Sequence, residues 1–169
     1  MSHIKEIYIE EKLYIQKTYT FFDDTFDIED ILKNHVLAAK YDLAPRIVKI
    51  ERYSDTCDVL IEYGGIPIRQ KLKELDSISQ LILARKCFEK IEQLNRLKIV
   101  HNDCHTDNIV ISEDDDIKFI DFDMSYTITD KNILNMIDKN HFLDSLQTSL
   151  KKSRSIQVRA FICVHQDHP

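Results

Sequence analysis

The chain has 169 residues, two of them glycine, with 43% hydrophobic and 31% charged residues and a formal net charge of −6. This mixture is typical of one globular domain or of two small lobes that share a core, and the acidic balance argues against a dedicated nucleic-acid-binding protein. Two adjacent glycines, Gly64 and Gly65, are too few for a dinucleotide-binding G-x-G-x-x-G or a Walker phosphate loop, and no run of about 18 apolar residues predicts a membrane span.

The first part of the chain predicts a small sheet with one helix. Four segments with alternating or continuous apolar residues predict strands: 4–9, 13–19, 46–52 and 59–63. Charged or polar residues predict turns at 10–12 and 54–58. Apolar residues at helical spacing predict a helix over 27–41, with Asp27 as its N-cap, and the glycine pair breaks the chain after the last strand.

The second part predicts more helix than strand. Apolar residues recur every three or four positions over 77–97, which predicts an amphipathic helix, and residues 130–150 predict another. Between them, an acidic turn at 113–116 separates the apolar runs 109–111 and 117–121 and predicts a hairpin.

The order of these elements predicts an α+β fold in three parts. A small sheet-rich lobe is expected over 1–63, a helix-rich core over 64–150, and a tail without clear periodicity over 151–169. The four cysteines lie far apart without a C-x-x-C pair, and the charged N-terminus lacks the apolar run of a secretory signal. Reduced thiols and a cytoplasmic location are therefore expected.

The stretch HNDCHTDNIVISEDDDIKFIDFD, residues 101–123, gathers polar side chains around the predicted hairpin. Asn108 follows Asp103 by five residues, and Asp121 follows Asp103 by 18. With His101, these spacings resemble the catalytic core of the protein-kinase-like phosphotransferase superfamily, whose pattern is H-x-D-x-x-x-x-N, a hairpin and then D-F-G. Phosphoryl transfer needs a carboxylate beside the attacking hydroxyl and oxygen ligands for Mg²⁺, which this spacing can bring together.

The resemblance implies ATP and Mg²⁺ as cofactors and a role for each matching residue. Asp103 is expected to be the catalytic base, and His101 a structural support of its loop. Asn108 and Asp121 are expected to bind the nucleotide's Mg²⁺, and Asp123, which replaces the glycine of D-F-G, is a further candidate ligand.

His105 stands where eukaryotic-type protein kinases usually carry lysine. The H-x-D-x-H-x-x-N version resembles the aminoglycoside/choline kinase-like branch and kinase-like proteins of large DNA viruses. His105 is therefore expected to act beside the catalytic base by donating a hydrogen bond to a phosphate. A loop histidine that faces solvent is the alternative.

The same resemblance extends upstream to a nucleotide site. Lys17 matches the lysine that pairs with the α- and β-phosphates, and a carboxylate of the following helix, Glu29 or else Asp30, is expected to hold it. Glu29 is preferred, and a solvent-facing strand lysine is the alternative reading of Lys17.

Two further features extend the resemblance. Glu62, Tyr63 and Gly64 resemble the hinge whose backbone meets the adenine edge, although a plain strand-to-turn break is the alternative. Asp144 resembles the buried aspartate that braces the catalytic loop, and an exposed helix aspartate is the alternative.

The sequence departs from the family in three ways: it has no glycine-rich loop, Asp123 replaces the D-F-G glycine, and little chain follows the motif. The expected fold is a compact two-lobed kinase-like one, with a reduced N-lobe sheet and a truncated helical C-lobe.

Several functions stay open at this point. An active atypical kinase would phosphorylate a hydroxyl, foremost a protein Ser/Thr, or else that of a small molecule resembling an aminoglycoside or choline. A pseudokinase would bind nucleotide or protein without turnover. The clustered His and Asp residues also allow a zinc or two-metal hydrolase. ATP and a hydroxyl substrate are the expected partners, without nucleic acid or membrane, and the sequence identifies neither the substrate nor the oligomeric state.

Overall fold

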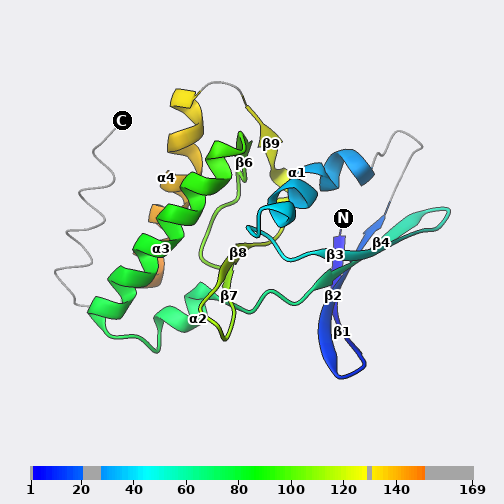
Figure 1. The fold of residues 1–169 in the computed structure, drawn as a ribbon, viewed down its shortest axis with the longest axis horizontal. Helices are drawn as coiled ribbons and strands as arrows, with labels where there is room; N and C mark the ends of the chain where they lie inside the picture. The colour runs from blue at the N-terminus through cyan, green and yellow to red at the C-terminus, as the bar shows by residue number, and fades with distance from the viewer. Residues whose placement is uncertain (1, 21–27, 129–130, 151–169) are drawn as a thin grey trace.

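The computed structural model describes residues 2–20, 28–128 and 131–150, which form two groups of elements (Figure 1). Strands and one helix make up the first group, whereas helices and a small hairpin dominate the second. This arrangement confirms the predicted α+β class. The predicted N-cap Asp27 and the tail 151–169 lie outside the described residues. Within the described ranges, no helix is both long and apolar enough to cross a bilayer.

Four antiparallel strands form the first sheet, in the order β1-β2-β4-β3. Their bounds are Ser2–Ile9 for β1, Lys12–Thr20 for β2, Ile47–Arg52 for β3 and Thr56–Glu62 for β4. Glu10 and Glu11, between β1 and β2, have φ of 47° and 66°, as the type I′ turn of a two-residue hairpin requires. Among the described residues this sheet thus has four strands, which correspond to the four predicted at 4–9, 13–19, 46–52 and 59–63.

Helix α1, Ile28–Lys40, covers the face of the sheet that carries Lys17. Side chains from both elements form a small buried cluster: Tyr19, Ile28, Leu32, Cys57 and Val59. The register sets Lys17 opposite Val59 and Tyr19 opposite Cys57, so these four residues point to one side. The turn predicted at 54–58 is wrong in its second half, because the buried Cys57 belongs to β4.

The second group contains two long helices, a hairpin and several short elements. Their bounds are Ile66–Pro67 for β5, Ile68–Leu72 for α2, Ser77–Arg96 for α3, Ile99–Val100 for β6, Ile109–Ile111 for β7, Ile117–Phe119 for β8, Phe122–Met124 for the 3₁₀ helix η1, Tyr126–Thr127 for β9 and Lys131–Leu150 for α4. The two long helices and the hairpin confirm the predictions. The other five elements have two to five residues, too few for a readable period.

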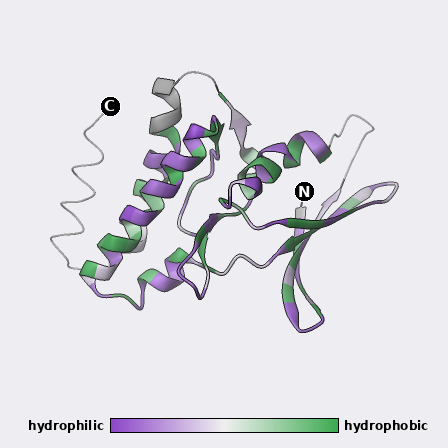
Figure 2. Ribbon diagram, in the orientation of Figure 1, coloured by the Kyte–Doolittle hydropathy of each residue, from purple (hydrophilic) through white to green (hydrophobic). Residues whose placement is uncertain are grey.

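The main core lies where α3 and α4 meet the hairpin. Hydrophilic and hydrophobic stretches alternate along α3, which is the pattern of an amphipathic helix (Figure 2). The residues buried there include Leu83, Cys87, Ile91 and Leu94 from α3, Phe142, Leu143 and Leu146 from α4, and Ile109 and Phe119 from the hairpin. This core fixes the hairpin, and with it the motif residues at the hairpin's ends.

The glycine pair lies where the chain passes from the sheet to the hairpin. A Cβ at Gly64 would come within 2.7 Å of a Pro45 side-chain carbon and 2.9 Å of a Val110 methyl carbon. Gly65 has φ of +119°, and a Cβ there would overlap the carbonyl oxygen of Ile111. Both glycines are therefore required by close packing and backbone conformation.

Candidate active site

A buried aspartate, Asp138 of α4, anchors the loop that begins the motif. Its two carboxylate oxygens accept hydrogen bonds from the backbone N–H groups of His101 and Asn102, both at 2.9 Å. Asn102 has φ of 62°, so the loop turns sharply here. Burial raises the pKa of Asp138, although the two N–H donors oppose that shift.

The predicted brace at Asp144 is wrong, because Asp144 is exposed on the same helix. Asp138, Phe142 and Leu146 recur every four residues and are fully buried. Six residues separate Asp144 from Asp138, which rotates its side chain about 240° around the helix. Asp138 lies on the same face of α4 as the apolar residues Phe142 and Leu146, and this spacing was the sequence signal that could have identified it as the buried aspartate.

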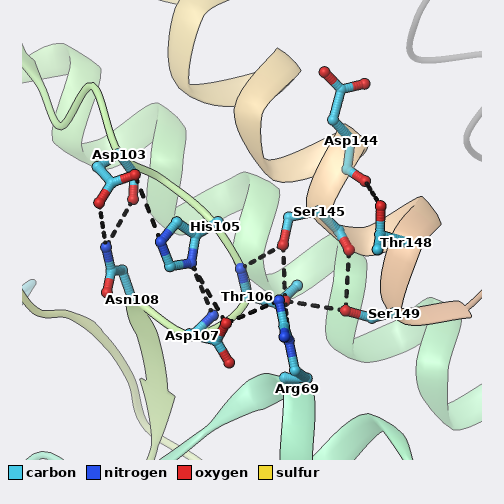
Figure 3. Close-up of polar contacts among 10 residues, drawn as sticks. All are labelled: Arg69, Asp103, His105, Thr106, Asp107, Asn108, Asp144, Ser145, Thr148 and Ser149. Atoms are coloured by element: carbon cyan, nitrogen blue, oxygen red, sulfur yellow. Dashed lines mark hydrogen bonds and ion pairs between the residues drawn. The ribbon is translucent and has the colours of Figure 1, made fainter.

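Asp103, His105 and Asn108 lie together in the loop (Figure 3). The Asn108 side-chain amide donates to the Asp103 carboxylate at 2.9 Å and to its backbone carbonyl at 3.0 Å. His105 Nε2 lies 3.5 Å from the other Asp103 carboxylate oxygen, and its Nδ1 accepts from the Asp107 N–H at 3.2 Å. The Asp103 carboxylate is about half exposed, so an incoming hydroxyl can reach it.

The middle of the loop contacts α4 through Thr106 and α2 through Asp107 (Figure 3). The Thr106 N–H donates to Ser145 Oγ at 2.9 Å, and its hydroxyl lies 2.8 Å from Ser145 Oγ and 3.1 Å from Ser149 Oγ. Arg69 of α2 pairs with the Asp107 carboxylate at 2.8 Å. No spacing in the sequence indicated these contacts, because each joins a loop residue to a distant helix.

The hairpin brings Asn108 and Asp121 to its open end. The Ile120 N–H donates to the Asn108 carbonyl at 2.9 Å, one residue beyond the last β7–β8 pair. Asp121 follows at once with left-handed φ and ψ of 63° and 64°, a conformation that turns the chain out of β8. Because the Asn108 amide nitrogen faces Asp103, its amide oxygen is the atom that could bind a cation. This oxygen and the Asp121 carboxylate are hard donors that fit Mg²⁺.

Lys17 joins the sheet to this end of the hairpin from 104 residues away in sequence. Its ammonium lies 2.5 Å from an Asp121 carboxylate oxygen and 2.6 Å from an Asp123 carboxylate oxygen. Tyr19, two residues along the same face of β2, donates its hydroxyl to Asp123 at 2.8 Å. Burial and the Asp123 charge raise the pKa of Tyr19, so it stays a donor. Tyr19 was not predicted as a site residue, although the period of two along a strand sets its side chain on the same face as that of Lys17.

The helix carboxylates predicted to hold Lys17 form other ion pairs. Glu29 pairs with Arg52 of β3, and Asp30 pairs with Lys33 one turn along α1. Lys17 is only 5% exposed and takes its counter-ions from the D-F-D segment instead. The predicted pairing of Lys17 with Glu29 is therefore absent from this structure.

The predicted hinge begins at Glu62, the last residue of β4, and continues through Tyr63 and Gly64. The Glu62 N–H already donates to the Arg46 carbonyl at 2.9 Å, and the Glu62 carboxylate is paired with the Arg46 guanidinium. Hydrogen bonds from Arg46 lower the pKa of Glu62. The Glu62 N–H is therefore already engaged with Arg46 rather than open to an adenine edge.

Two buried histidines enclose Phe122 of the D-F-D segment. The His35 ring of α1 lies 5.2 Å from the Phe122 ring, and the His101 ring lies 4.7 Å from it. His35 Nε2 is 2.7 Å from the Pro45 carbonyl, and His101 Nε2 is 2.9 Å from the Ile120 carbonyl. Burial lowers the pKa of both rings, so they pack as neutral groups. These tilted ring contacts link α1, the loop and the D-F-D segment.

The zinc or two-metal alternative gains no support from the geometry. Among the described residues, no group of three or more His, Cys, Asp and Glu side chains is arranged to hold a metal ion. Its proposed ligands are used elsewhere, since His101 contacts a backbone carbonyl and His105 contacts two aspartates.

Comparisons with known proteins agree with this geometry. The family model of the ABC1 atypical kinase-like domain matches residues 39–149. The chain is 32% identical over 97 residues to the carbon catabolite-derepressing protein kinase of Saccharomyces cerevisiae, and 31% identical over 97 residues to that of Candida glabrata. Each match covers 53% of this chain, and the chain spans only 15% and 16% of those two proteins.

A solved structure shares the fold. The kinase PK-1 of the Cydia pomonella granulovirus matches with a TM-score of 0.56 and 16% identity, over 70% of this chain and 45% of that one. This similarity shows a protein-kinase-like fold, as the motif at 101–123 predicts. With the family model matching more than half of its length, the chain belongs to the ABC1 atypical kinase-like domain family.

Proposed function

We propose that this chain binds ATP with Mg²⁺ between the first sheet and the hairpin, and transfers the γ-phosphoryl group to a hydroxyl. The observation that carries the proposal is the meeting of Lys17 and Asp121, whose charged groups lie 2.5 Å apart although their residues are 104 positions apart in sequence. A buried lysine, a metal-binding carboxylate and a loop carboxylate within one kinase-like fold match the needs of phosphoryl transfer.

Each group has a defined task in the proposed reaction. Lys17 binds the α- and β-phosphates, while Asn108 and Asp121 hold Mg²⁺, which when bound neutralises charge on the phosphates. Asp103 accepts the proton of the substrate hydroxyl as that oxygen bonds to the γ-phosphorus. The bond from phosphorus to the bridging oxygen breaks, and ADP leaves with its electron pair. His105, beside Asp103, donates to a transferring phosphate oxygen.

We propose a protein Ser/Thr hydroxyl as the acceptor. This choice is supported by the yeast relatives, which are named protein kinases, whereas a small-molecule hydroxyl rests on the His105 variant of the motif alone. Nucleotide binding without turnover is the second candidate function. It is supported by the ion pair of Lys17 with Asp121, which must open before Asp121 can hold Mg²⁺ for transfer.

Binding and turnover measured on the same variants test the proposal. Calorimetry with Mg²⁺–ATP and transfer of labelled γ-phosphate to a mixed Ser/Thr peptide pool would be applied to wild type, Asp103→Asn and Asp121→Asn. Asp144→Asn, an exposed change on α4, is the matched control.

If the chain is an active kinase, Asp121→Asn should lose Mg²⁺–ATP binding and Asp103→Asn should lose phosphate transfer. Asp144→Asn should match wild type in both assays. Binding without transfer in wild type would favour the second candidate. No binding in wild type would reject both.

A further inference from the structure

Each carboxylate oxygen of Asp123 has one partner from β2. One oxygen lies 2.6 Å from the Lys17 ammonium, and the other accepts the Tyr19 hydroxyl at 2.8 Å. Lys17 and Tyr19 are 5% and 6% exposed, whereas the Asp123 side chain is 31% exposed, so buried groups of β2 meet a carboxylate at the edge of solvent. Asp123 is thus held at both oxygens, and Tyr19 fixes the direction from which it meets Lys17.

Asp121 is placed differently from Asp123. Only one of its oxygens has a hydrogen bond or ion pair among the described residues, although its side chain is about as exposed as that of Asp123, 38% against 31%. It also has the left-handed backbone that turns it out of β8 towards the Asn108 end of the hairpin. Of the two carboxylates, Asp121 is therefore the one with a free oxygen for a cation.

The α1 carboxylates are engaged with other partners. Glu29 pairs with Arg52 and Asp30 pairs with Lys33, so neither serves as the counter-ion of Lys17 in this structure. Asp123 lies in the 3₁₀ turn and is not among the residues with positive φ, so this position has no need of glycine. An aspartate can occupy it without strain.

We propose that Asp123, held by Tyr19, is the carboxylate that orients Lys17 towards the nucleotide phosphates, in place of a carboxylate on α1. This role rests on the proposed function for its nucleotide. Each aspartate then binds a different cation. Asp123 stays paired with the Lys17 ammonium, and Asp121 becomes free to bind Mg²⁺. Asp123 and Tyr19 are positioning residues, because they act through Lys17.

The test compares the two rival carboxylates by nucleotide affinity. Asp123→Asn should weaken Mg²⁺–ATP binding about tenfold, which corresponds to about 1.4 kcal/mol. Tyr19→Phe should weaken it about threefold, because Asp123 loses its second contact. Glu29→Gln should stay within twofold of wild type, and Asp144→Asn is the exposed control. In turnover assays the loss should fall mainly on KM, since Lys17 contacts phosphate in the ground state as well.

Two results would overturn the proposal. One is weaker binding in Glu29→Gln with unchanged binding in Asp123→Asn, which would return the role to α1. The other is tighter binding in Asp123→Asn, which would make Asp123 a competitor of the phosphates for Lys17.

A second measurement separates this inference from the proposed function. Lysines labelled with ¹³C-methyl groups report the surroundings of Lys17 by NMR without nucleotide. The Lys17 signal should move in Asp123→Asn and not in Glu29→Gln. If wild type binds no nucleotide, the proposed function fails, while an unmoved signal in Asp123→Asn would refute the Lys17–Asp123 pair itself.

Discussion

Replacing Asp138 by alanine should loosen the catalytic loop and destabilise the whole domain. The carboxylate is fully buried and accepts two backbone N–H groups at 2.9 Å, from His101 and Asn102. The N–H of His101 is buried, so its loss of a partner costs about 1–3 kcal/mol. The N–H of Asn102 is partly exposed, and its hydrogen bond is worth about 0.5–1.5 kcal/mol. The sum predicts a loss of about 1.5–4.5 kcal/mol in the free energy of unfolding.

Urea unfolding followed by circular dichroism measures this loss, with Asp144→Ala as the matched control on the same helix. Asp144 is exposed, so its replacement should change the free energy of unfolding by less than about 0.5 kcal/mol. Asp138→Asn keeps one acceptor and should fall between the two. A loss below about 1 kcal/mol in Asp138→Ala, or equal losses in the two alanine variants, would refute the reasoning.

Three further changes test other parts of the fold. Gly65→Ala should cost about 3 kcal/mol or more in urea unfolding, because φ is +119° and the new Cβ overlaps the Ile111 carbonyl; a loss below about 1 kcal/mol would contradict this. Burial lowers the pKa of His35 in the folded protein, so below about pH 6.5 the unfolded chain binds a proton at this residue before the folded protein does. The free energy of unfolding should therefore fall by about 1 kcal/mol per pH unit as the pH is lowered. His35→Gln should flatten the fall in stability from pH 6.5 to 5.5, and an unchanged slope would reject this source. Arg69→Ala should lower kcat about threefold to tenfold by freeing Asp107, while the melting temperature changes little because the ion pair is partly exposed; unchanged kcat would show that the contact is dispensable.

Local patterns predicted most of the regular elements. Alternating residues in 4–9 and 13–19 and the helical period over 77–97 match β1, β2 and α3. Such patterns are readable because one face of each element is buried over several repeats. The short elements β5, β6 and β9 were missed, because a two-residue strand exists only through its pairing with a distant segment.

The pairing of charges was the least predictable part of the site. The sequence predicted an ion pair between Lys17 and Glu29, but in the fold Lys17 forms ion pairs with Asp121 and Asp123. It also predicted Asp144 as the aspartate that supports the loop, whereas α4 is oriented so that Asp138 is buried. Both errors concern contacts between elements far apart in the chain, whose geometry no local spacing contains.

By itself, the sequence determined the α+β class, the spacing of Asp103, Asn108 and Asp121, and the exclusion of glycine-rich phosphate loops. These follow from short-range chemistry, since a hairpin of fixed length sets where its flanking residues lie. Only the tertiary structure decided which acids meet Lys17, which aspartate braces the loop, and why the two remaining glycines are needed. Those outcomes depend on how the sheet, the hairpin and α4 pack, because a buried charge or N–H takes whichever partner the packing brings within reach.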